Sequence, residues 1–422
     1  MEIIISENID VLSKETYLGN KEIEELKNLI LTLGKSDIES QQRMIDLSIE
    51  NLKKQIDIRM KTEFDGVVFY TTMLLVFVGI VMVFSASFIQ SSFKHNDAYY
   101  FLKKNVIYAV LGFIVMIITS RIDYSFWKKN ATAIGAIAVV LLLLVLTPLG
   151  IEANGAKRWL GIGALTFQPA EIAKFATIIL TAKLIEKNYD KIKSLTKGVV
   201  PLLVVPGIFF ALIILQPNLS TAGTVILVTF VMIFVAGMDM KIVFAMIGSG
   251  AALFAALVIA EPYRLSRVTS FLDPFQDPLG KGYQVIQGLY ALGSGGLFGL
   301  GLGKSKQKYF YIPEPQNDFI FAIIGEELGL IGCIIVIMLF VVLVYRCVRI
   351  ALKTSNVFAC MVVIGIGAQI GIQAALNIAV ATSSMPATGV ALPFISYGGT
   401  SLTIFMGAVG IVLNISKHVK IN

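Results

Sequence analysis

The stretch that decides the fold is YIPEPQNDFIFAIIGEELGLIGCIIVIMLFVVLVY, residues 311–345. A turn-rich segment with two prolines gives way at Asp318 to an apolar run that continues to residue 345. A run of this length can cross a hydrocarbon core about 30 Å thick. Because a spanning segment must satisfy its own backbone hydrogen bonds, we expect residues 318–345 to form a transmembrane helix.

Three acidic side chains accompany this run, although it is strongly apolar. Asp318 lies at its start, where a helix N-terminus favours a carboxylate, so a capping role and a catalytic role are equally open. Glu326 and Glu327 lie about 12 Å further along the helix, too far to share one small substrate with Asp318. Buried acids of this kind are either functional or held in structural ion pairs.

The composition of the whole chain is that of a polytopic membrane protein. Of 422 residues, 56% are hydrophobic and 15% charged, and the mean hydropathy is +0.78. We therefore predict an all-α fold of about ten transmembrane helices. The other runs lie near 66–87, 105–120, 131–149, 169–186, 198–215, 219–238, 241–260, 356–380 and 391–415.

Lys and Arg in the short loops indicate the orientation of these spans. They gather in the loops that face the cytoplasm if the N-terminus is inside, which predicts that both termini are cytoplasmic. A large loop, residues 261–317, is then extracellular. Its aromatic content argues against disorder, and we expect its apolar stretch near 284–300 to lie along the membrane surface.

Residues 1–65 differ from the rest of the chain. They are rich in charge, carry apolar residues at helical spacing, and are interrupted by Gly34. We expect a cytoplasmic N-terminal helical extension, folded as a small hairpin, followed by a transmembrane domain at residues 66–418. The extension is either a simple appendage or a docking surface for a partner.

Any chemistry must rest on carboxylates, hydroxyls and cations. His95 and His418 are the only histidines in the sequence, so we expect neither a zinc site nor a histidine-based triad. In QPAEIAKF, Glu171 and Lys174 are three residues apart on one helix face. They form either an intrahelical ion pair or, with Arg158, Lys157, Arg264 and Arg267, a group of cations for a phosphate-bearing ligand.

A further candidate stretch is MPATGVALPFISYGGTSL, residues 385–402. Its prolines and glycines interrupt the helical pattern, and irregular backbone at membrane depth must be buried in protein or line a watery cavity. Ser396, Tyr397 and Thr400 are candidates to line such a site. Small residues also occur where membrane helices simply pack closely, so both interpretations stay open.

Four motifs together resemble one family. RWLGIGALTFQPAEIAK, RVTSFLDPFQDPLGKGYQ, YIPEPQNDFIFAIIGEELG and LPFISYGGTSL are similar, in order and spacing, to the shape, elongation, division and sporulation (SEDS) family of bacterial cell-wall polymerases. The likeness covers residues 66–418 and is greatest to the division and sporulation branch. Residues 1–65 lie outside it.

This resemblance implies a ten-helix peptidoglycan glycosyltransferase in the bacterial plasma membrane. Such an enzyme polymerises lipid II onto a lipid-linked glycan strand on the outer face and works with a class B penicillin-binding protein and the division or sporulation machinery. No nucleic-acid partner is expected. The resemblance makes Asp318 the catalytic residue. It also implies functional importance for Glu171, Lys174 and the motif at Ser396–Ser401, of which Ser396, Tyr397, Gly398 and Gly399 are substrate-binding candidates. We add Arg158, Trp159, Arg264, Arg267 and Gln284 as further substrate-binding candidates, with Glu326 and Glu327 in support.

We therefore expect Asp318 to act as a general base on the acceptor sugar, with cations neutralising the pyrophosphate that leaves. No cofactor is required by this scheme, although a divalent cation such as Mg²⁺ or Mn²⁺ bridging the phosphates is left open. Two alternatives remain at this point, a lipid II flippase and a noncatalytic scaffold that recruits a penicillin-binding protein.

The chain departs from the usual family pattern at a few positions. QPNLST stands where relatives carry QPDLGT, so Asn218 and Ser220 replace an acid and a glycine. Asn317 replaces a threonine next to the expected catalytic position, and Ser383 replaces a glycine. These departures put a role for charge at position 218 in doubt.

Overall fold

The structure is a computed structural model that describes residues 42–43, 45–50, 64–153, 155–162, 165–280 and 282–419. Residues 65–416 belong to one compact unit, and residues 1–64 belong to another. The hairpin predicted for residues 1–65 falls almost entirely outside the described residues. Of that segment, residues 42–43 and 45–50 are helical.

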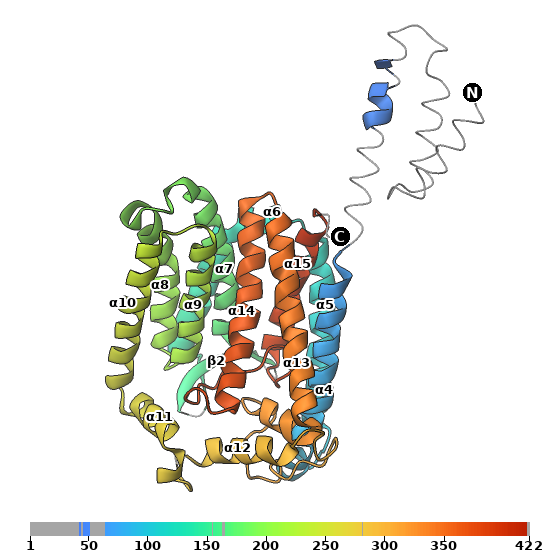
Figure 1. Ribbon diagram of the computed structural model, residues 1–422, viewed down its shortest axis with the longest axis vertical. Coiled ribbons are helices and arrows are strands. Elements are labelled where there is room, and N and C mark those ends of the chain that lie inside the picture. Colours follow the sequence, from blue (N-terminus) through green and yellow to red (C-terminus); the bar gives the residue numbers. More distant parts are fainter. Residues whose placement is uncertain are drawn as a thin grey trace, which may run out of the picture. The chain divides into compact units, whose positions relative to one another are not determined.

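The compact unit is a bundle of long helices that run side by side (Figure 1). Among the described residues, seven helices are long and apolar enough to span a membrane, and two shorter apolar helices accompany them. The predicted polytopic helical class is therefore confirmed, while the number of spans stays a prediction. The helices of the bundle are α4 (Gly66–His95), α5 (Tyr100–Arg121), α6 (Tyr124–Leu146), α7 (Pro169–Lys187), α8 (Val200–Ile214), α9 (Leu219–Val235), α10 (Met240–Ile259), α13 (Ile320–Lys353), α14 (Val357–Ala381) and α15 (Thr400–Ser416).

The long segment 261–317 contains regular structure at one end of the bundle. It forms α11 (Pro262–Leu272), a 3₁₀ turn at Pro274–Gln276 and α12 (Tyr283–Gly295). Figure 1 shows α12 lying across the direction of the bundle helices. The helix packs on α13 and buries Val285, Ile286 and Ala291. The segment therefore covers the end of the bundle at which α13 begins.

A small sheet precedes α7, which the all-α prediction missed. Strands β1 (Ile151–Ala153), β2 (Ala156–Ile162) and β3 (Leu165–Phe167) form an antiparallel meander in that order. The first turn uses Gly155 at φ 75°, a conformation that glycine adopts without steric cost. The strands are too short to produce a clear alternating pattern, but β3 leads through Gln168 directly into α7 and so fixes where that helix starts.

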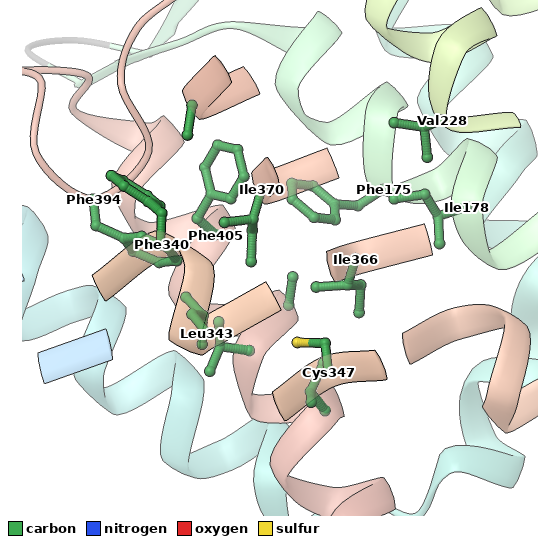
Figure 2. Packing of buried hydrophobic residues seen from close by; sticks show 14 of the residues in the cluster. Phe175, Ile178, Val228, Phe340, Leu343, Cys347, Ile366, Ile370, Phe394 and Phe405 are labelled. Atoms are coloured by element: carbon green, nitrogen blue, oxygen red, sulfur yellow. The ribbon is translucent and has the colours of Figure 1, made fainter. Parts of the chain in front are cut away.

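The apolar core joins helices that lie far apart in the sequence (Figure 2). It includes Phe175 of α7, Phe340 of α13, Ile370 of α14 and Phe405 of α15. Phe405 makes edge-to-face contacts with Phe175, at 5.2 Å between ring centroids, and with Phe394, at 5.6 Å. Helix α14 is the most enclosed of the seven long apolar helices. Other helices therefore pack around α14, and the site residues are placed against it.

A partly buried ion pair closes the opposite end of the bundle. Asp65 caps α4 by accepting a hydrogen bond from the Val68 N–H at 3.0 Å and pairs with the Arg346 guanidinium at 2.6 Å. Its own N–H donates to Ser416 Oγ at 3.0 Å. These contacts tie the start of α4 to the ends of α13 and α15.

Helix α13 is broken at Gly329, which has φ 68° and ψ −168°. The backbone groups released by the break pair with the segment that follows α12. Leu300 N–H donates to the Glu326 carbonyl at 2.9 Å, and Leu330 N–H donates to the Gly296 carbonyl at 2.9 Å. The first turns of α13, which follow Asp318, therefore form a short helical piece of their own.

We expect Gly329→Ala to destabilise the protein, because its backbone lies in a region almost exclusive to glycine. An added Cβ would also approach the Gly299 nitrogen to 2.4 Å. Backbone strain of this kind costs about 1–3 kcal/mol. The midpoint of thermal unfolding in detergent should fall, whereas Gly248→Ala in α10, where a Cβ meets no atom within 4 Å, should change it little. Equal midpoints for the two variants would contradict this account of the break.

Candidate functional site

Asp318 lies in the turn that leads into α13. The N-cap of this helix is Phe319 and makes no side-chain capping bond, so the capping interpretation of Asp318 is wrong. The Asp318 carbonyl accepts a hydrogen bond from Asn377 Nδ2 at 2.8 Å, which fixes the backbone. Among the described residues, the Asp318 carboxylate makes no hydrogen bond, and a Cβ on Gly389 would lie 3.4 Å from its Oδ2.

The environment of Asp318 disfavours its charged form. Burial raises its pKa from 3.8 to about 6, the nearby Glu314 carboxylate raises it further, and Arg267 opposes both. An acid with this pKa is mostly ionised at neutral pH but binds a proton far more readily than an exposed aspartate. These properties suit a general base.

The irregular segment 385–399 packs directly against the Asp318 turn. Ser396 Oγ donates to the Asn317 carbonyl at 2.7 Å and accepts from the Leu392 N–H at 2.7 Å. Tyr397 N–H donates to the Gln316 carbonyl at 2.9 Å. The third candidate stretch is therefore in contact with the first, and its residues 392–396 are buried in protein.

The two glycines of the SYGGTS motif allow close packing at this point. Tyr397 packs edge-on against Phe101 of α5, with ring centroids 4.9 Å apart. Gly399 has φ 51°, and a Cβ there would lie 3.3 Å from the Tyr108 ring. A Cβ on Gly398 would lie 3.2 Å from Ser401. The motif therefore packs closely against Phe101 and Tyr108 of α5.

Glu171 and Lys174 form the ion pair that their spacing predicts. Glu171 Oε1 lies 2.8 Å from Lys174 Nζ, and both side chains are buried. The pair also joins other helices, because Ser401 Oγ donates to Glu171 Oε2 at 2.7 Å and Lys174 Nζ donates to Gln373 Oε1 at 2.7 Å. It is more than an intrahelical contact, since it links α7, α14 and α15.

Sequence reasoning missed two buried amides of α14, Gln373 and Asn377. Gln373 contacts Lys174, and Asn377 contacts the backbone of Asp318. Their four-residue spacing within an apolar helix was the available signal, because residues four apart lie on the same face.

The expected arginines lie on two elements, Arg158 on β2 and both Arg264 and Arg267 on α11. Arg267 of α11 donates to the Ala387 carbonyl at 2.8 Å and acts on the pKa of Asp318. Arg264 donates to the Leu257 carbonyl at 2.9 Å. Arg158 of β2 donates to the carbonyls of Gln216 and Pro217. Arg267 is therefore an arginine whose positive charge acts on Asp318.

For two further substrate-binding candidates, the described residues show no hydrogen bond or ion pair with Asp318. Trp159 lies in β2 and Gln284 in the first turn of α12, and both are partly buried. Their roles stay predictions.

Glu326 and Glu327 hold the segment that leads toward Asp318. Glu326 accepts hydrogen bonds from Ser305 Oγ at 2.5 Å and from the Lys306 N–H at 2.8 Å. Glu327 pairs with Lys308 at 2.9 Å and accepts from Ser85 Oγ of α4 at 2.7 Å. Both glutamates are therefore held in structural contacts. Their partners come mainly from the loop that precedes α13.

The departures from the family pattern also find structural roles. Asn218 caps α9 by accepting a hydrogen bond from the Thr221 N–H at 3.3 Å, a role that needs no charge. Ser220 Oγ donates to the Thr388 carbonyl at 2.7 Å and so supports the irregular segment. Asn317 Nδ2 donates to Glu314 Oε2 at 2.8 Å.

A metal site was left open by the sequence. Within the described part of the chain, no three His, Cys, Asp or Glu side chains converge on one point. Asp318 and Glu314 are the acids whose charges interact beside the site. The protein's own side chains therefore offer a divalent ion few ligands, and its role stays a prediction.

Comparison with known proteins finds relatives that are similar over most of the chain. Stage V sporulation protein E of Bacillus subtilis is 44% identical over 360 residues, which are 85% of this chain and 98% of the relative. A probable peptidoglycan glycosyltransferase FtsW of Geobacter sp. (strain M18) is 40% identical over 358 residues, again 85% and 98%. Residues 1–84 are also similar to stage III sporulation protein AB, and they include the extension that the motifs left out.

Solved structures share the fold. One is a chain from a structure described as "Structural coordination of polymerization and crosslinking by a peptidoglycan synthase complex", with a TM-score of 0.71 at 28% identity, covering 85% of this chain and 98% of that one. Another is the rod shape determining protein RodA of Thermus thermophilus, with a TM-score of 0.64 at 26% identity, covering 86% and 99%.

The resemblance carried by the four motifs is thus confirmed over the whole transmembrane unit. Residues 65–421 match the family described as "Cell cycle protein", which groups FtsW, RodA and SpoVE. The chain, which holds Asp318 in the turn before a broken helix and contains a buried Glu171–Lys174 pair, therefore belongs to the FtsW/RodA/SpoVE family.

Proposed function

We propose that this protein is a peptidoglycan glycosyltransferase that polymerises lipid II into glycan strands. The observation that carries the proposal is the Asp318 carboxylate, which is desolvated, has a pKa near 6 and makes no hydrogen bond among the described residues. Asp318 is partly buried, and partly desolvated acids with a raised pKa are typical of active sites. The names of the relatives support the same activity.

In the proposed reaction, Asp318 removes the proton from the 4-hydroxyl of the acceptor sugar. The hydroxyl oxygen bonds to the anomeric carbon of the lipid-linked donor strand, and the bond from that carbon to the phosphate oxygen breaks with inversion. The electron pair leaves with undecaprenyl pyrophosphate. One carboxylate suffices, because a pyrophosphate needs neutralisation of charge rather than a general acid.

Neutralisation of the leaving group is the task proposed for Lys174, Arg158, Arg264 and Arg267. Arg267 has the best support, since its charge already acts on Asp318. The hydrogen bond of Arg264 goes to the neutral Leu257 carbonyl, which does not cancel the positive charge. A divalent ion would supplement these cations through the phosphate oxygens of the substrate.

The proposed setting is the bacterial plasma membrane, with about ten spans, cytoplasmic termini and residues 261–317 outside. This orientation puts Asp318 on the outer side, where the growing glycan lies. We further propose that a class B penicillin-binding protein crosslinks the product, within division or sporulation machinery. The likeness to a chain of a peptidoglycan synthase complex supports such a partner.

The buried charges favour polymerisation over lipid translocation. A polar path through the bundle needs ionisable groups that can engage a passing headgroup. Here Glu171 is paired with Lys174, and Glu327 with Lys308. A scaffold without activity would have no need of an unpaired, desolvated acid. Both alternatives are therefore less well supported than the polymerase.

Asp318→Asn should lower polymerisation of lipid II by about a hundredfold or more, because general base catalysis typically contributes that much. The measurement is glycan strand formation from labelled lipid II by the purified protein with its crosslinking partner. Asp97→Asn, which alters an acid paired with Lys103 in the turn between α4 and α5, is the matched control and should keep its activity. Full polymerisation by Asp318→Asn would refute the assignment.

The pH dependence of kcat/KM should follow the ionisation of Asp318. Its pKa is raised to about 6 by burial, so the base is lost as the pH falls through 6. The rate constant should then drop about tenfold for each further pH unit. A profile that stays flat down to pH 5 would contradict a base with this pKa.

Asp318→Asn should also stabilise the protein at neutral pH. A raised pKa means that the folded state holds its proton between pH 4 and 6 while the unfolded state has lost it, so Asp318 contributes less stability as the pH rises through this range. The gain in thermal midpoint over the wild type should therefore be larger at pH 7 than at pH 4. Asp97→Asn should not show this gain, because Lys103 lowers the pKa of Asp97. A loss of stability on Asp318→Asn would indicate a structural role instead.

A further inference from the structure

Three amide side chains follow one face of α14, at Gln369, Gln373 and Asn377. Each is at most 2% exposed, although the helix around them is apolar. Successive positions four apart stack above one another along a helix. Burying an amide is unfavourable unless it makes hydrogen bonds, so the partners of these side chains indicate their purpose.

Gln373 is the amide that contacts the charged pair. Its Oε1 accepts from Lys174 Nζ at 2.7 Å and from Gln369 Nε2 at 2.9 Å. Its Nε2 donates to the Ala391 carbonyl at 3.0 Å. Gln373 therefore joins Lys174 to the irregular segment, and Gln369 holds the orientation of its amide.

Asn377, one turn along, makes the corresponding link to Asp318. Its Nδ2 donates to the Asp318 carbonyl at 2.8 Å and to the Val390 carbonyl at 2.8 Å. Both hydrogens of one amide nitrogen are thereby used. The orientation of the group is fixed, because the opposite flip would place an oxygen against two carbonyls.

The two amides donate hydrogen bonds to consecutive carbonyls, those of Val390 and Ala391. The expected base and the buried lysine are thus attached to adjacent peptide groups through side chains one helical turn apart. No contact between Asp318 and Lys174 themselves is found among the described residues. Lys174 and the Asp318 carbonyl are nevertheless connected by four hydrogen bonds of 2.7–3.0 Å, joined through the backbone between Val390 and Ala391.

We propose that Gln373 and Asn377 are positioning residues that set the separation between Asp318 and Lys174. The inference rests on the proposed function, in which the base and the cation act on opposite ends of the same transfer. Such a role matters because displacement of a reacting group by about 1 Å can cost a hundredfold in rate. Substrate binding, by contrast, depends on many contacts and tolerates a small shift.

The test uses the full-length protein and three variants, Gln373→Leu, Asn377→Leu and Asn414→Leu. Asn414 is a matched control, because its Nδ2 also makes a buried bond to a carbonyl, that of Ser120 at 3.2 Å, near the far end of α15. The measurements are kcat and KM for lipid II polymerisation and the midpoint of thermal unfolding. Asn377→Asp, which keeps the shape and removes the amide donors, replaces Asn377→Leu if the latter does not fold.

We expect Gln373→Leu and Asn377→Leu each to lower kcat by about 30- to 100-fold while KM changes less than about threefold. Asn414→Leu should lose a comparable amount of thermal stability and keep its kcat. The double variant of Gln373 and Asn377 should be little worse than either single variant, because both act on one shared distance.

Three results would overturn the proposal. They are a kcat loss in Asn414→Leu that matches the others, a rise in KM at unchanged kcat, and losses that multiply in the double variant. Failure of the proposed function is separable from these, since it would appear as a wild type that does not polymerise lipid II. An active wild type with a fully active Asn377→Leu variant would refute the positioning role alone.

Discussion

A charge buried among apolar helices must be paired, and Lys174 meets this requirement with Glu171 of its own helix and Gln373 of α14. Breaking such a pair is costly, because the remaining charge stays desolvated. Ser401 then attaches the same pair to the start of α15. Three helices are thereby held in register by one ion pair, and the irregular segment that contacts Asp318 is held between two of them.

Much of the fold and part of the site could be predicted because the deciding signals are local. Spans follow from apolar runs, and the pairing of Glu171 with Lys174 follows from helical spacing. The motif that contains Ser396 was expected to approach the site, and its hydroxyl does bond to the Asn317 carbonyl beside Asp318. The catalytic role of Asp318 is predicted by the family resemblance. Its position in the sequence alone favours a catalytic role and a capping role equally.

The parts that escaped prediction depend on partners distant in the sequence. Glu326 is satisfied by residues about twenty positions earlier, in a loop without periodicity. Gln373 and Asn377 carry no charge, so their sequence resembles ordinary helix packing until the carbonyls that they bind are known. The short strands around Gly155 are set by pairing with one another rather than by an alternating pattern.

The break at Gly329 has a mechanical consequence. The helical piece that follows Asp318 is only about two turns long before the break, so it can tilt as a separate lever from the remainder of α13. A twist applied to the long part would be absorbed at the glycine instead of rotating the carboxylate. The lever is coupled instead to the irregular segment after α12, through the backbone hydrogen bonds to the Glu326 and Glu327 carbonyls. Motion of the segment between α12 and α13 is therefore transmitted to Asp318 more directly than motion of the long part of α13.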